Sequence, residues 1–100
     1  MDAYCYILFS EKLNGFYIGA TTIDPNERLK NHINQIYGKT KYTVKANDWE
    51  IYLTIKCKSK KQSLDIESHI KKMKSKKYIK NLKIYPEIIK KLQNKYSNNS

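Results

Sequence analysis

The chain is poor in the residues that cross-link, break or loosen a polypeptide, with two cysteines, two prolines and three glycines among 100 residues. Cys5 and Cys57 lie far apart, each inside an apolar strand-like segment, so we expect buried thiols and neither a disulfide nor a metal pair. No apolar run approaches the roughly 20 residues of a transmembrane helix, and the first residues do not resemble a signal peptide. We therefore expect a soluble intracellular protein that does not associate with a membrane.

Acidic residues are also scarce. Nine acidic residues face twenty basic ones, which gives a formal net charge of +11 and a pI near 9.6. This balance favours nucleic acid or an anionic membrane surface over an acidic small molecule as the partner, and of the two we expect nucleic acid. One hundred residues suffice for one small domain, which we expect over residues 1–96 with a frayed tail at 97–100, and leave no room for a second domain that reads sequence.

Arginine is the rarest basic residue, since Arg28 stands alone among the twenty. Its planar guanidinium offers a rigid fork of donors to two phosphate oxygens, which a lysine ammonium cannot do. Arg28 lies one helical turn before His32, so both side chains share an edge of the expected helix. This position points to phosphate, and the alternative is a solvated helix residue.

The first half of the chain predicts a hairpin followed by a helix. Apolar runs at residues 4–9 and 16–20 flank a polar turn, which is typical of a β-hairpin. Asp24 and Pro25 then open a helix that we expect to extend to about Tyr37, because they supply an N-cap and a first-turn proline.

The second half predicts a third strand and three helical segments. Residues 49–57 alternate, with Trp49 and every second residue after it expected on one face. Ser59 opens a capping box for a helix to about Lys74, and residues 75–82 and 86–96 are expected to form two shorter helices. We therefore predict an α+β fold in which a small three-stranded antiparallel sheet is flanked by helices.

The polar residues on these elements form a recognisable order. Tyr6 and Tyr17 stand eleven positions apart, Gly19 closes a Tyr-Ile-Gly motif, and Arg28 and a helical glutamate, Glu67, follow. In this order the chain resembles the GIY-YIG nuclease domain over about residues 3–82. The downstream half is similar to the small stand-alone members that are related to the N-terminal domain of the excinuclease subunit.

The resemblance implies a metal-dependent DNA endonuclease. Glu67 would be the sole protein ligand of a Mg²⁺ or Mn²⁺ ion, which fits the habit of Mg²⁺ to keep most of its waters. Arg28 would grip the scissile phosphate, and Tyr6 or Tyr17 would deprotonate or hold the attacking water. His32 would hydrogen-bond a tyrosine or the phosphate, since a neutral imidazole can accept a phenol proton.

We expect supporting roles for Gly19 and Asn81. Gly19 lacks a side chain, which would let the backbone or the substrate phosphate come close. Asn81 falls where some relatives carry a supporting asparagine, and an ordinary residue near a helix end is the alternative. The residue after the Tyr-Ile-Gly motif is Ala20, where some relatives carry a lysine, so any assisting lysine must come from elsewhere.

Lysines flank the expected site on both sides. The candidates for contacts with the nucleic-acid backbone are Lys39, Lys41, Lys71, Lys74, Lys76 and Lys77. The DNA would be a single strand, a duplex or a branched form, and without an appended reading domain we expect a preference for structure or for single strands, with DNA repair as one setting. The alternatives are a non-catalytic basic nucleic-acid-binding module on the same fold and a small protein that acts through its charge alone.

Overall fold

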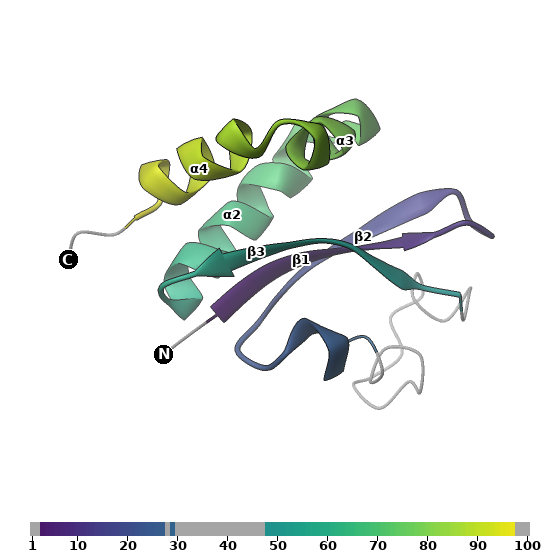
Figure 1. The fold of residues 1–100 in the computed structure, drawn as a ribbon, viewed down its shortest axis with the longest axis horizontal. Helices are drawn as coiled ribbons and strands as arrows, with labels where there is room; N and C mark the ends of the chain where they lie inside the picture. Colours follow the sequence, from purple (N-terminus) through teal and green to yellow (C-terminus); the bar gives the residue numbers. More distant parts are fainter. Residues whose placement is uncertain (1–2, 28, 30–47, 98–100) are drawn as a thin grey trace.

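The computed structural model describes residues 3–27, 29 and 48–97 (Figure 1). Strand β1 (Ala3–Ser10) and strand β2 (Gly15–Thr21) form the predicted hairpin and pair antiparallel, with Phe9 opposite Phe16. Asn14 supplies the left-handed turn residue, with φ of 48°, and its N–H donates to the Glu11 carbonyl oxygen at 3.1 Å. An asparagine tolerates this conformation better than most residues, so it closes the turn with little strain.

Strand β3 (Glu50–Cys57) pairs antiparallel with β1, so the sheet order is β2-β1-β3 and β2 is an edge strand. The expected continuous alternation along β3 is wrong at one point. Ile7 pairs with Leu53 and Leu8 with Ile51, which leaves Tyr52 as an extra residue. A bulge of one residue moves every later side chain to the other face. Trp49 and Ile51 therefore pack on the opposite face from Ile55 and Cys57.

One face of the sheet is covered by three helices: α2 (Lys60–Met73), α3 (Lys76–Ile84) and α4 (Pro86–Lys95) (Figure 1). The three helices predicted for this half of the chain are confirmed. Helix α2 packs on β1 and β2, and its Ile66 and Ile70 are buried against Cys5 and Ile7. Both cysteines are buried free thiols, as predicted. The α+β class with a three-stranded antiparallel sheet is likewise confirmed.

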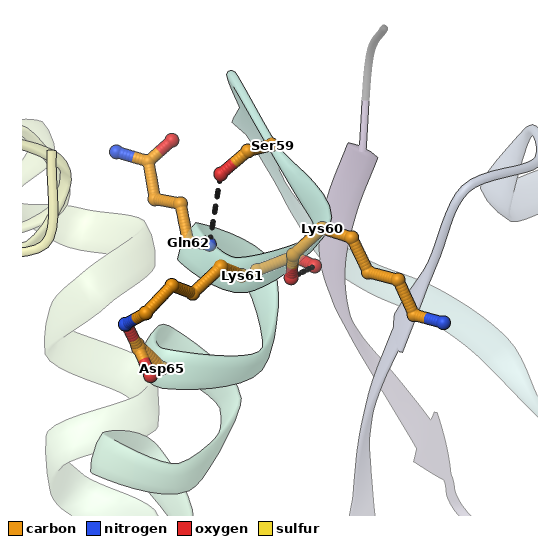
Figure 2. Close-up of polar contacts among 6 residues, drawn as sticks. Ser59, Lys60, Lys61, Gln62 and Asp65 are labelled. Atoms are coloured by element: carbon orange, nitrogen blue, oxygen red, sulfur yellow. Dashed lines mark hydrogen bonds and ion pairs between the residues drawn. The ribbon is translucent and has the colours of Figure 1, made fainter. Parts of the chain in front are cut away.

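Helix α2 begins where the sequence predicts. Ser59 is the N-cap, and its hydroxyl accepts from the Gln62 N–H at 3.1 Å (Figure 2). Lys60 and Lys61 leave this first turn in opposite directions, and Lys61 reaches Asp65 at 2.8 Å. The Gln62 side chain is buried, accepts from the Lys58 N–H and donates to the Gln93 carbonyl oxygen, which ties α4 to the start of α2.

The other face of the sheet holds a smaller core around Tyr6, Leu8 and Trp49. The helical residues that follow β2 lie on this side (Figure 1), and Leu29 packs against the same core. Most of the helix predicted for residues 25–37 lies outside the described residues. None of the described helices is long and apolar enough to span a membrane.

Candidate active site

The hairpin brings the two halves of the tyrosine motif into direct contact. In the β1–β2 register Tyr6 is the cross-strand partner of Gly19. A Cβ added to Gly19 would overlap the Tyr6 phenol, with its hydroxyl oxygen as the nearest atom. Tyr6 is fully buried. Because Gly19 has no side chain, the Tyr6 ring can lie against the backbone of β2, with its hydroxyl group next to Gly19.

Tyr17 lies on the same face of the sheet, two residues before Gly19 along β2. It is half-buried and packs against the core of Tyr6, Leu8 and Trp49. Its ring meets the Trp49 ring edge to face, with centroids 6.4 Å apart. Both motif tyrosines are thus held by packing on the sheet face that the segment after β2 approaches.

Two of the predicted catalytic residues, Arg28 and His32, lie outside the described residues, and so do Lys39 and Lys41. Their neighbour Leu29 is described and contacts the Tyr6 core. The roles expected for these four side chains stay predictions.

Glu67 lies in the middle of α2, between the buried residues Ile66 and Ile70. Its side chain is 18% exposed, and Oε2 lies 3.0 Å from Lys71 Nζ, four residues further along the helix. The carboxylate therefore lies at the border between core and solvent, already paired with a cation. An i,i+4 pair of this kind contributes only about 0.2–0.5 kcal/mol to the helix, so a stronger cation can displace the lysine.

The position of Glu67 along the sheet follows from its neighbours on α2. One turn before it, Leu64 shares a pocket with residues 20–23 of β2 and its extension. One turn after it, Lys71 shares a pocket with Phe16 and Ile18. Residues three and four apart lie on one face of a helix. Glu67 is consequently level with the middle of β2 on the helix-covered face, whereas Gly19 and Tyr6 contact each other on the opposite face.

The electrostatics agree with this placement. Burial raises the pKa of the Cys5 thiol far above its ordinary value, and the charges of Cys57 and Glu67 add to the rise. Cys5 pairs with Ala20, the residue after Gly19, and lies on the helix-covered face of the sheet. The charge of Glu67 therefore acts on the helix-covered face of β1 at the level of Ala20.

The donor set fits a metal that takes few protein ligands. Within residues 3–27, 29 and 48–97, no three His, Cys, Asp or Glu side chains gather into a cluster. Such a site does not suit a structural zinc, which takes four protein ligands. A single partly exposed carboxylate suits Mg²⁺ or Mn²⁺, because Mg²⁺ keeps several waters and binds through one or two carboxylates.

The remaining predicted residues divide into two groups. Lys71, Lys74 and Lys76 line one groove between the hairpin and the α2–α3 junction, whereas Lys77 is exposed on α3 and is not among the groove's lining residues. Asn81 is half-buried on α3, and its carbonyl oxygen accepts from the Tyr85 N–H at 2.8 Å. No hydrogen bond between described residues joins Asn81 to Glu67.

Sequence reasoning missed Phe16 as part of this groove, although its alternation with Tyr17 along the edge strand places it on the helix-covered face. The ion pair between Lys71 and Glu67 was also not predicted, although their i,i+4 spacing was the available signal.

Comparison with known proteins agrees with the motif and the fold. The family model described as the GIY-YIG catalytic domain matches residues 2–80, which include the hairpin, β3, α2 and part of α3. No curated protein and no solved structure gives a significant match. The domain points to an endonuclease that acts on nucleic acid, and enzymes of this type generally use divalent metal ions. Because the match spans well over half of the chain, this protein belongs to the GIY-YIG family.

Proposed function

We propose that this protein is a metal-dependent DNA endonuclease that hydrolyses phosphodiester bonds and prefers single-stranded or otherwise non-duplex DNA. The proposal rests on the alignment of three residues along the edge strand β2. Tyr6 contacts Gly19 on one face of the sheet, and Glu67 lies level with Gly19 on the helix-covered face. An edge strand has one side without a neighbouring strand, so a phosphate can approach there.

Phosphodiester hydrolysis needs a nucleophile made from water, neutralisation of the charge on the phosphate oxygens and stabilisation of the departing oxygen. When bound at Glu67, a divalent ion would supply part of that neutralisation and would lower the pKa of water. Glu67 would hold the ion from helix α2. Its neighbours Ile66 and Ile70 are anchored in the core, which limits movement of the carboxylate.

The tyrosines act on the water and the phosphate. The Tyr6 hydroxyl is fixed in position by Gly19 and the surrounding core, and Tyr17 is held by Trp49, so either phenol can orient the attacking water or take its proton. Arg28 then grips the phosphate with its planar fork of donors, and His32 hydrogen-bonds a phenol or the phosphate. Asn81 and Lys77 remain candidates for supporting contacts.

The test compares two carboxylates on the same helix. Purified wild type, Glu67→Gln and Asp65→Asn are incubated with labelled single-stranded, duplex and branched DNA in Mg²⁺, Mn²⁺ or EDTA. Asp65 is the matched control because it pairs with Lys61 on another side of α2. A metal ion contributes several kcal/mol to such a reaction, so Glu67→Gln should lose about 10²–10³-fold in rate. Asp65→Asn should cleave like the wild type.

Two results would contradict the proposal. Cleavage that persists in EDTA would exclude metal dependence, and equal rates for Glu67→Gln and wild type would remove Glu67 from the site. Binding of DNA by all three proteins without any cleavage would favour the non-catalytic binding module.

A further inference from the structure

A groove leads away from Glu67 along the hairpin. One wall comes from the hairpin, with Asn14, Phe16 and Ile18, and the other from the α2–α3 junction, with Lys71, Lys74 and Lys76. We call it the hairpin groove. Lys71 pairs with Glu67 at 3.0 Å, so one end of the groove opens at the candidate metal ligand.

The hairpin groove is basic. Its lining contains three lysines and no aspartate or glutamate. Lys76 reaches across the groove and donates to the Asn14 carbonyl oxygen at 2.7 Å. Lys74 is exposed in a left-handed conformation with φ of 47°, where it ends α2. Several lysines that line one groove can bind a ligand that carries repeated negative charges.

Aromatic rings continue the hairpin wall beyond the groove. Phe16 packs with Phe9 at 5.1 Å and with Tyr52 at 5.0 Å between ring centroids, and all three rings are half-buried. Lys83 from α3 lies 4.4 Å from the centroid of the Tyr52 ring. We call Phe9, Phe16, Tyr52 and Lys83 the aromatic platform. Phe16 belongs to both features, so groove and platform are continuous.

We propose that the hairpin groove and the aromatic platform bind one strand of DNA, with phosphates on Lys74 and Lys76 and bases on the platform. The proposal rests on the proposed function and specifies its substrate. Proteins that bind single strands combine a basic groove with aromatic rings on which bases stack. A duplex keeps the faces of its bases stacked inside, so it can use the lysines and not the rings. The groove would then deliver a single strand to Glu67.

Binding is measured without catalysis, so that it can succeed or fail independently of cleavage. The probe is a fluorescein-labelled oligothymidylate of about 15 nucleotides, titrated in EDTA and followed by fluorescence anisotropy. The test variant is Lys74→Gln/Lys76→Gln, which spares Lys71. The matched control is Lys90→Gln/Lys91→Gln, which removes the same charge from exposed positions on α4.

The two double variants should differ in their affinity for the single strand and in its salt dependence. The slope of log Kobs against log salt is negative, and each lost phosphate contact makes it shallower by about 0.7 for a single strand. The Lys74→Gln/Lys76→Gln variant should therefore show a slope that is shallower by about 1.4 than that of the wild type. The same relation gives a loss of affinity of about 10–25-fold at 0.1 M salt. The α4 double should stay within about twofold of the wild type.

The platform is tested by Tyr52→Leu with two probes. Stacking of one base is strong enough that the variant should bind oligothymidylate about fivefold or more weakly than the wild type. An abasic strand of the same length should bind both proteins equally, which a merely structural defect would not produce. The wild type should also bind the single strand more tightly than a duplex.

Equal losses in the groove double and the α4 double would overturn the groove, and equal losses on the two probes would overturn the platform. Duplex binding as tight as single-strand binding would overturn the choice of substrate. If the variants bind DNA as expected and the wild type cleaves DNA with no metal tested, the proposed nuclease activity is wrong and the proposed binding groove is supported. If cleavage holds and binding does not depend on Lys74 and Lys76, the groove fails alone.

Discussion

Replacing Gly19 by alanine adds one methyl group at the closest contact of the tyrosine motif. The added Cβ would overlap the phenol of Tyr6, and the ring is fully buried. The ring cannot simply swing into solvent, because Leu8 and Trp49 pack in the same core. We therefore expect Gly19→Ala to displace the Tyr6 hydroxyl or to open the hairpin.

Two effects of opposite sign decide the magnitude. Glycine inside a strand is less favourable than alanine by roughly 0.5–1 kcal/mol, so the replacement alone would stabilise the protein. Overpacking a buried site costs about 1–3 kcal/mol. The overlap with Tyr6 should win, and the free energy of unfolding should fall by about 1–2 kcal/mol. For a domain of this size the melting temperature should fall by about 4–16 °C.

Urea denaturation monitored by circular dichroism measures the free energy of unfolding, and the cleavage assay with Mg²⁺ measures the rate of DNA cleavage. Cleavage by the folded variant should fall by about 10²-fold, since a displacement near 1 Å at a catalytic group costs that much. In a Tyr6→Leu background the shorter side chain leaves space, so Gly19→Ala should no longer destabilise. An unchanged or higher unfolding free energy in the wild-type background would refute the close approach of Tyr6 to Gly19.

Three further predictions concern stability. Ser59→Ala removes the hydrogen bond to the Gln62 N–H (Figure 2) and should lower the free energy of unfolding in urea by about 1 kcal/mol. The Ser10 hydroxyl lowers the pKa of Asp48, so the stability from this carboxylate is present above its unfolded pKa and lost as the pH falls through its lower folded pKa. Urea titrations should show the difference between wild type and Asp48→Asn shrinking below about pH 4, and a difference that is constant with pH would contradict it. Burial lowers the pKa of His69, so stability should fall as the pH drops below about 6.5, and His69→Gln should flatten that dependence in thermal melts.

The sequence predicted those features whose causes are local. The hairpin follows from two apolar runs around a turn with Asn14, and α2 follows from the capping residue Ser59. The bulge at Tyr52 could not be predicted, because nothing in the alternation of residues 49–57 indicates an extra residue. Pairing with β1 decides it, and pairing is a property of two segments.

The candidate site divides in the same way. The order Tyr6, Tyr17, Glu67 predicted the family, which the match over residues 2–80 confirms, while the role of each residue stays a prediction. The reason for Gly19 came only from the register, which places the Tyr6 ring against it.

By itself the sequence determined the elements, their caps, the net charge of +11 and the motif that marks the family, because each depends on residues close together in the chain or on composition. Only the tertiary structure decided that Glu67 lies level with Gly19 and that Phe16 and Lys76 share a groove. Those neighbours are separated by about half of the chain, and they meet because α2 must bury Ile66 and Ile70 against the hairpin. Burial of apolar surface is roughly proportional to area and carries no direction of its own, so the packing of the whole core sets where the polar groups of the site come to lie.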